Sequence, residues 1–477
     1  MEIKKNEIKY LQKRRRDDVG EIFIWEGKIL RGIYHHQTPM VKSFFDSGFI
    51  LELIEKELFP NSWISEYTSK DYGVIVEHHK IDPVIYPQEW TFSMLKDSAL
   101  AVLQVAKIAG KYGYNMKDCH GFNILMEGNK PKFIDLGSFH PNREGCTGWE
   151  PYGEFLRFYY FPLFMWKDGM EYTSKLSIFS ANLMQPTEHF VYRYRFLRFL
   201  RGKLLERLIK FVFLFSNIAR MDYMSMNKKF QKKNKLVTSG AKTVKELINR
   251  SGIFISQDLV KLENRIQKIK RKELNTPWKE YHSLISKKSN RFEKIIDFVN
   301  IHCSDARTAI DIAGNQGMFS SMVLQETGIE RIICQDLDEQ AIDIGYNAQK
   351  GNENISFVNY NFIAPIVKTT HPFPHDRFKA DITFALALLH HLILTQGFDL
   401  DDILIELDKY TNKYVCVEFM PRGLWVYKDG SQVNIPEWYT SDWFRDNFLK
   451  HFDLLAEEQI AENYIVFIGK KRKQGNG

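Results

Sequence analysis

The stretch 308-TAIDIAGNQGMFSSMVLQET-327 joins a short apolar run, a turn of small residues and a segment with helical spacing. The run ends at Asp311, and Ala313, Gly314 and Gly317 follow it. Small residues let a backbone turn come close to a bound ligand, although an ordinary tight turn explains them as well. The same rhythm recurs downstream, which predicts an α/β fold with a parallel sheet and helices on both faces.

The recurring segments place polar residues where the expected strands end. Asp336 ends the second strand, where an acid can accept hydrogen bonds from both ribose hydroxyls. His390 and His391 follow the fourth strand, and a histidine suits removal of a proton from an attacking hydroxyl near neutral pH. Neighbouring helical residues point about 100° apart, so only one of the two readily faces a pocket. A buried capping histidine beside a surface histidine is the plain alternative.

These residues resemble the class I S-adenosyl-L-methionine-dependent methyltransferases, whose first motif is commonly a strand followed by DxGxxxG. The resemblance covers roughly residues 295–470, with Ala313 and Asn315 at positions where Gly is common. It implies a Rossmann-like domain that binds S-adenosyl-L-methionine. The implied cofactor-binding residues are Asp311, Ala313, Gly314 and Gly317 near the methionine, Asp336 on the ribose and Asn361 at the adenine. Catalytic candidates are His390, His391 and Glu418, the last as a second base, a substrate contact or an ordinary strand-end acid.

A second motif lies in 116-MKDCHGFNILMEGNKPKFIDLGSF-139, where Asp118, Asn123 and Asp135 follow a long predicted helix. In kinase chemistry one Asp orients the attacking hydroxyl, and an Asn and a second Asp hold the metal. The stretch resembles the catalytic and metal loops of protein-kinase-like and aminoglycoside-phosphotransferase-like folds. That resemblance implies Asp118 as catalytic residue, Asn123 and Asp135 as metal ligands, and ATP with Mg²⁺ as cofactors.

No glycine-rich phosphate loop precedes this motif. The candidates for a nucleotide clamp are Lys28, Arg31 and Glu52 or Glu55. Without a clamp, phosphoryl transfer loses much of its positioning. Three interpretations therefore stay open: an active phosphotransferase, a degenerate kinase-like module, and a polar turn between two strands.

Four regions are expected along the chain. Residues 1–145 form an α+β protein-kinase-like domain, residues 146–225 its helical extension, residues 226–295 a linker with helices, and residues 296–473 the methyltransferase domain. The combination resembles a bacterial family of nodulation-protein-like methyltransferases with a kinase-like front half. That resemblance implies the tailoring of glycans or lipid-linked saccharides.

Composition limits the partners and the compartment. The net charge of +7 over 477 residues is modest and spread out, so nucleic acid is not expected. Five cysteines form no CxxC pair, and no secretory leader or apolar run of spanning length is seen, so we expect a cytoplasmic protein. The stretch 196–215 interrupts an apolar stripe with cations. Packing against the core is its plain interpretation, and peripheral docking at an anionic inner membrane surface is the sharper one.

The expected function is an O-methyltransferase that acts on a sugar, glycan or lipid-linked saccharide, with the kinase-like domain binding or phosphorylating this acceptor. The alternative is a non-catalytic scaffold in which both nucleotide sites are degenerate. The presence of Asp118, Asn123 and Asp135 favours chemistry, whereas the missing phosphate loop favours a scaffold.

Overall fold

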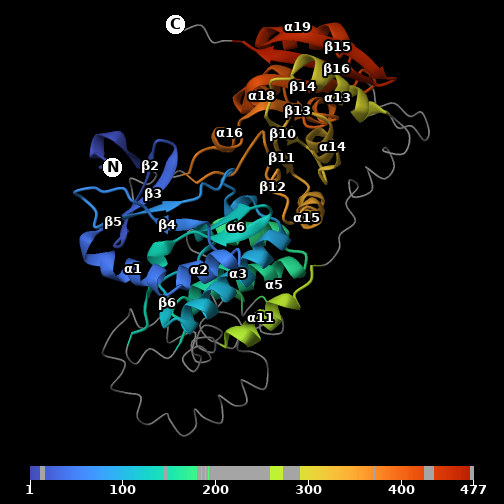
Figure 1. Cartoon of the computed structure of the whole chain (residues 1–477). Helices are drawn as coiled ribbons and strands as arrows, with labels where there is room; N and C mark the ends of the chain where they lie inside the picture. The colour runs from blue at the N-terminus through green and yellow to red at the C-terminus, as the bar shows by residue number, and fades with distance from the viewer. Residues whose placement is uncertain are drawn as a thin grey trace. The chain divides into compact units, whose positions relative to one another are not determined.

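The chain forms two compact units in a computed structural model (Figure 1). Unit 1 contains residues 1–82, 95–125 and 131–273, and unit 2 contains residues 83–94, 126–130 and 274–477. The structure describes residues 1–10, 17–143, 148–179, 258–271, 290–368, 371–423 and 435–472, together with residues 184, 188, 189 and 192.

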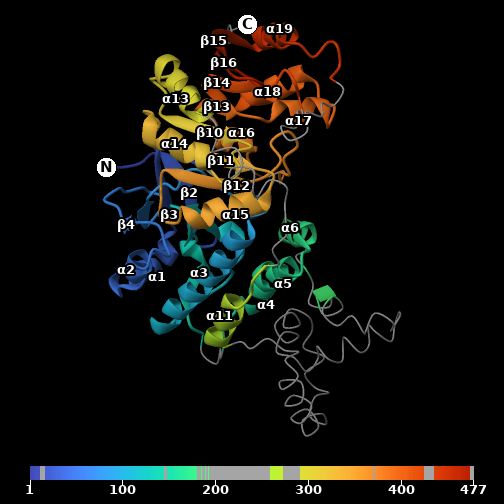
Figure 2. The same ribbon diagram turned by 90° about the vertical axis from the view of Figure 1, so that its right-hand side faces the viewer.

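Unit 2 is built on a seven-stranded sheet in the order β12-β11-β10-β13-β14-β16-β15, which can be followed in Figure 2. The strands from β12 to β14 are parallel, and β16 and β15 complete the sheet in antiparallel pairing. The parallel strands are mostly buried, as expected of a sheet covered on both faces. The strands are β10 (Thr308–Ile312), β11 (Arg331–Asp336), β12 (Ile355–Asn359), β13 (Ala380–Ala385), β14 (Thr411–Phe419), β15 (Phe452–Ala461) and β16 (Tyr464–Lys471).

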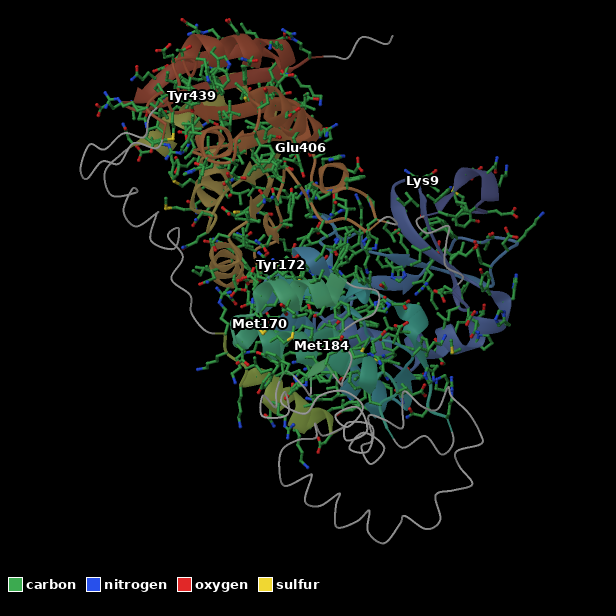
Figure 3. The ribbon with its side chains drawn as sticks, turned by 180° about the vertical axis from the view of Figure 1, so that it is seen from behind. Lys9, Met170, Tyr172, Met184, Glu406 and Tyr439 are labelled. Carbon is green, nitrogen blue, oxygen red and sulfur yellow. The ribbon has the colours of Figure 1, made fainter. Side chains whose placement is uncertain are left out.

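Helices cover both faces of this sheet. Helices α13 and α14 pack together on one face, and α18 and α19 pack together on the other (Figure 1). Figure 3 labels Glu406 on α18 and Tyr439, whose buried ring lies 4.9 Å from that of Phe419 at the end of β14. The helices are α13 (Arg291–His302), α14 (Met318–Glu326), α15 (Glu339–Ala348), α16 (Pro374–Arg377), α17 (Leu389–Leu394), α18 (Leu400–Tyr410) and α19 (Ser441–His451). The predicted Rossmann-like α/β architecture of the C-terminal region is confirmed.

The strand order reverses at β10. The chain runs from β10 outward to β11 and β12, and then returns to β13 on the other side of β10. Ile312 of β10 pairs with Ala385 of β13, so the two strands end at the same edge. In open α/β sheets a ligand crevice lies outside the carboxyl ends of the strands at such a reversal. The fold therefore directs attention to the residues that follow β10, β11 and β13.

Two short segments from the first third of the chain belong to unit 2. Glu89, in a 3₁₀ turn (η3, Pro87–Glu89), is almost fully buried and forms a bidentate ion pair with Arg377. Asn129 donates to the backbone carbonyls of Gln349 and Ile355 at 3.0 and 2.9 Å. The sequence analysis expects residues 1–145 to form one continuous domain. In the structure, two segments within this range, residues 83–94 and 126–130, belong to unit 2.

Acidic side chains of α15 hold the first residues of α3 (Phe92–Lys111) within unit 2. The backbone N–H of Phe92 donates to Glu339 at 2.8 Å, and the N–H and hydroxyl of Ser93 donate to Asp343 at 2.8 and 2.9 Å. The first N–H groups of a helix have no partner within the helix, and negative charge is favourable there. Helix α15 therefore caps the start of α3.

Unit 1 begins with an antiparallel sheet in the order β1-β2-β3-β5-β4, followed by mostly helical structure. The long predicted helix is α3, after which Gly113 takes a φ of 79°. The kinase-like domain and its helical extension over residues 146–225 stay predictions, because most of residues 180–225 lie outside the described part of the chain. The sheet strands are β1 (Lys9–Tyr10), β2 (Gly20–Trp25), β3 (Lys28–Ile33), β4 (Ser62–Ile64) and β5 (Val74–His78), and two short pairs are β6 (Tyr114–Met116) with β9 (Phe139–Pro141) and β7 (Ile124–Glu127) with β8 (Lys130–Phe133). The helices are α1 (Thr38–Asp46), α2 (Phe49–Glu55), α4 (Tyr152–Phe155), a π-helical turn (Leu156–Tyr160), α5 (Phe161–Lys167), α6 (Glu171–Phe179) and α11 (Leu259–Gln267). Short 3₁₀ turns lie at η1 (Lys5–Glu7), η2 (His35–Gln37), η4 (Gly121–Asn123) and η5 (Leu136–Ser138).

Two sequence predictions lie outside the described residues. The apolar and cationic stretch 196–215 is one of them, and most of the predicted linker at 226–295 is the other. Within the described part of the chain, no helix combines the length and the apolarity that crossing a membrane requires.

Candidate functional site

The turn after β10 has a backbone that small residues make possible. Ala313, Asn315 and Gly317 take positive φ angles of 61°, 52° and 78°. Such angles are strained for most residues and free of strain for glycine. A Cβ at Gly314 would lie 2.7 Å from the Asp311 carboxylate, so no larger residue fits there. Gly314 therefore follows from the close approach of the turn to Asp311, and Gly317 follows from its positive φ and from the Phe357 ring, which a Cβ would meet at 2.9 Å.

Asp311 lies beneath this turn, almost fully buried near the end of β10. Ser320 donates its hydroxyl to the carboxylate at 2.6 Å. Burial raises the pKa of Asp311 to about 7, because the low-dielectric surroundings disfavour the charged form. Asp311 shapes the turn from below.

Asp336 at the end of β11 is a second carboxylate that contacts the turn. One of its oxygens accepts the N–H of Asn315 at 2.9 Å, and the other accepts the N–H of Asp338 at 2.8 Å. Burial raises the pKa of Asp336 to about 6, against the opposing effect of these backbone hydrogen bonds. Each carboxylate oxygen has lone pairs beyond the one bond it accepts from the backbone. Asp338, in contrast, caps α15 by accepting the N–H groups of Gln340 and Ala341.

Asn361, predicted at the adenine, lies two residues beyond the end of β12. Its side-chain oxygen accepts the N–H groups of Ile363 and Ala364 at 3.1 and 3.4 Å, and the residue is exposed. The buried Asn359 instead donates to the carbonyl of Asp336 at 2.8 Å and so supports the end of β11. Sequence reasoning did not single out Asn359.

His390 and His391 lie in α17 with their ring centres 4.1 Å apart. His390 is almost fully buried, and its Nδ1 has no hydrogen-bond partner among the described residues. Burial, helped by the nearby His391 and Arg291, lowers the pKa of His390 to about 3, and burial also lowers the pKa of His391. Both rings are therefore neutral near pH 7. His390 is a weak proton acceptor but a competent hydrogen-bond partner for a substrate group.

Glu418 has a different environment from the one its position at the strand end suggested. It is fully buried and accepts two hydrogen bonds from Arg291, from Nε at 2.6 Å and from Nη2 at 2.5 Å. A third donor is the N–H of Ala387 at 2.8 Å. Because three donors and a counter-charge already engage this carboxylate, the predicted role as base or substrate contact is revised. Arg291 lies 127 residues away, and the sequence carried no signal for it.

In unit 1 the structure brings Asp118, Asn123 and Asp135 together around Ser138. Asn123 donates to Asp118 at 2.6 Å, and the Ser138 hydroxyl lies 2.5 Å from that same oxygen. The hydroxyl also lies 3.0 Å from Asp135, whose other oxygen accepts the N–H of Gly137 at 3.0 Å. The sequence analysis did not single out Ser138, although its place three residues after Asp135 was a usable signal.

Asp135 also lies beside a positively charged side chain. Nη2 of Arg31, on β3, donates to Asp135 at 3.0 Å and to the carboxylate of Asp17. The Arg31 side chain is 3% exposed, and neither its Nε nor its Nη1 has a partner among the described residues. Burial alone would raise the pKa of Asp135, but Arg31, Ser138 and Gly137 together hold that pKa below its ordinary value. Within the described ranges, no three or more His, Cys, Asp or Glu side chains gather in a way that could hold a metal ion.

Comparisons with known proteins give one clear relative. No family model matches the chain. The nodulation protein NoeA of Rhizobium meliloti (strain 1021) is 24% identical over 433 residues, which is 85% of this chain and 84% of that protein. This similarity agrees with the resemblance to nodulation-protein-like proteins over most of the chain.

The solved structures that match cover about two fifths of the chain. An O-methyltransferase family protein from Burkholderia thailandensis is 16% identical, with a TM-score of 0.27 over 38% of this chain and 55% of that one. This match spans little more than half of the Burkholderia protein. The N-methyltransferase NodS from Bradyrhizobium japonicum WM9 is 11% identical, with a TM-score of 0.29 over 39% of this chain and 98% of that one.

Proposed function

We propose that the chain is an S-adenosyl-L-methionine-dependent methyltransferase whose cofactor binds in unit 2. One observation carries the proposal: Asp336, whose hydrogen-bond partners among the described residues are backbone N–H groups, lies beside the small-residue turn where the strand order reverses. A carboxylate there can accept both ribose hydroxyls, and the turn admits a ligand close to its backbone. The buried and unpartnered Nδ1 of His390 offers a further polar contact after β13. The residues present therefore fit this cofactor.

When bound, the cofactor supplies an electrophilic methyl group. Asp336 holds and orients the ribose, and Asp311 keeps the turn in the conformation that accommodates the methionine part. His390, neutral because it is buried, accepts or donates one hydrogen bond and thereby orients the acceptor. Because its pKa is so low, His390 does not take the proton from an acceptor hydroxyl beforehand, and this proton would pass to water as the new O–C bond forms.

The acceptor class that we propose is a hydroxyl of a sugar, glycan or lipid-linked saccharide, at the cytoplasmic side of the inner membrane or in the cytoplasm. This part rests on the resemblance to nodulation-protein-like methyltransferases, with which the similarity to NoeA agrees.

For unit 1 we propose acceptor binding without phosphoryl transfer. ATP with Mg²⁺ needs free carboxylate oxygens, because Mg²⁺ takes oxygen ligands in near-octahedral geometry. Asp135, however, is ion-paired with Arg31, and Asp118 accepts from Asn123 and Ser138. These residues do not fit a bound metal while the ion pair is intact.

Calorimetric titration with S-adenosylhomocysteine tests the proposal for unit 2. Replacement of Asp336 by Ala removes charge-assisted hydrogen bonds and should weaken binding by about 1 to 3 kcal/mol, whereas Asp402→Ala, at an exposed site on α18, should leave it unchanged. If the wild-type chain takes up no S-adenosylhomocysteine, the non-catalytic scaffold becomes the better account.

A further inference from the structure

The buried pair of Arg291 and Glu418 connects two parts of unit 2 that are distant in sequence. Arg291 is the first residue of α13, and Glu418 lies one residue before the end of β14. Arg291 is 4% exposed and Glu418 0%, and the guanidinium carbon lies 4.4 Å from the ring centre of Tyr464. Burying two charges is costly unless their geometry is good and their remaining hydrogen-bonding capacity is used.

The third donor to Glu418 comes from a strained residue. Ala387 has a φ of 49°, in the left-handed region that alanine rarely adopts, and its N–H donates to Glu418 at 2.8 Å. Sparsely populated backbone conformations persist when surrounding groups hold them, and they gather at functional sites. Here the group that holds the backbone is the carboxylate, which Arg291 in turn keeps in place.

Ala387 lies in the short connection between β13 and α17, which carries His390. Ala385, the last residue of β13, pairs with Ile312 of β10 and with Val417 of β14. The connection therefore starts at the same edge of the sheet as the turn of residues 313–317, where the cofactor is proposed to bind. The ion pair therefore does more than connect two core elements, because it also holds the strained Ala387 at the edge of the sheet where the cofactor is proposed to bind.

We infer that Arg291 and Glu418 form a positioning pair, which fixes the connection of residues 386–388 and so sets the place of His390 beside the methyl donor. The inference rests on the proposed function for its role in catalysis, but the hold on Ala387 can be measured independently. Under this inference Glu418 orients the connection that carries His390 and does not act as a base.

Glycine at position 387 provides the matched control, because glycine adopts positive φ without strain. We expect Glu418→Gln to speed amide hydrogen exchange across residues 386–394. It should also weaken S-adenosylhomocysteine binding by about tenfold, because the released connection no longer keeps its place at the edge of the sheet where the cofactor is proposed to bind. In the double variant Glu418→Gln/Ala387→Gly the affinity should return to within about threefold of the Ala387→Gly variant. A purely structural pair would show no such restoration, and its absence overturns the inference.

A second variant keeps the ion pair intact in case Glu418→Gln prevents folding. Ala387→Val places a β-branched side chain at positive φ, which is strongly disfavoured. It should loosen the connection and weaken cofactor binding while the rest of unit 2 keeps its exchange protection. Unchanged exchange across residues 386–394 in this variant overturns the inference. If wild-type protein binds no S-adenosylhomocysteine, the proposed function fails, while hydrogen exchange still decides whether the pair holds Ala387.

Discussion

Asp336 in unit 2 is the last residue of β11 and Asp135 in unit 1 lies two residues beyond β8, yet the surroundings of these two strand-end acids differ. Asp135 accepts a hydrogen bond from the buried Arg31, which helps to hold its pKa below the ordinary value. Within the described part of the chain, Asp336 accepts hydrogen bonds from backbone N–H groups and from no side chain, and burial raises its pKa to about 6. A carboxylate with a charge partner is already satisfied, whereas one held by neutral dipoles gains from ligand hydroxyls. The hydrogen-bond partner therefore distinguishes the two sites: a charged partner occupies Asp135, whereas backbone partners leave Asp336 able to accept a ligand.

Removal of the counter-charge in unit 1 should have the largest effect. Arg31→Met leaves Asp135 and Asp17 without their shared cation, and loss of one partner of a buried pair costs about 3 to 5 kcal/mol. Urea unfolding of the full chain should show this loss, and the double variant Arg31→Met/Asp135→Asn should show a smaller one.

Calorimetry with Mn²⁺ alone adds a second readout: we expect no uptake at Asp135 in the wild type and uptake in Arg31→Met. Uptake by the wild type that Asp135→Asn abolishes would contradict the assignment of Arg31 as resident cation.

The second prediction concerns the free energy of unfolding and its dependence on the charge of the buried Asp311. Asp311 has a folded-state pKa of about 7, above its value in an unfolded chain. Its charged form therefore destabilises the folded state, fully above pH 7 and not at all below about pH 4. Asp311→Asn should stabilise unit 2 at pH 8 by on the order of 2 to 4 kcal/mol and by little at pH 4. Thermal unfolding at the two pH values measures this, and equal effects at both would show that the carboxylate is not penalised by burial.

The smallest expected effect separates the two neighbouring acids after β11. Asp338 caps α15, so Asp338→Ala should lower stability by about 1 kcal/mol through the lost cap. It should weaken S-adenosylhomocysteine binding less than Asp336→Ala does. A larger loss of affinity in Asp338→Ala would move the ribose contact from Asp336 to Asp338.

Much of the sheet in unit 2 could be predicted because its strands are buried on both faces and read as continuous apolar runs. The turn after β10 could also be predicted, because the lack of room for a Cβ at Gly314 and Gly317 requires glycine at these positions, and glycine is recognisable in the sequence. In unit 1, Asp118, Asn123 and Asp135 were recognisable because their order and spacing are local in the sequence.

Pairings between distant residues could not be predicted from local pattern. The interpretation of Glu418 stayed open between a second base, a substrate contact and an ordinary strand-end acid, because its partner Arg291 lies far away in the chain. Nothing near Glu89 in the sequence indicates that Arg377 neutralises it. Nothing near Asn129 in the sequence indicates that its amide donates to the carbonyls of Gln349 and Ile355. In each case tertiary hydrogen bonds decided the role of a residue whose local sequence was unremarkable.

The pH dependence of cofactor binding tests the central claim most directly. An ionised Asp336 accepts both ribose hydroxyls, whereas a protonated one gives up acceptor capacity, so affinity should be constant above about pH 7 and fall as pH drops through 6. Calorimetry with S-adenosyl-L-methionine from pH 5 to pH 8 should show a loss approaching about tenfold per pH unit at the acid end. In Asp336→Asn the affinity should be weaker and should lose this dependence. The same pH profile in both proteins, or no binding in either, would contradict the assignment of Asp336 as the group that holds the methyl donor.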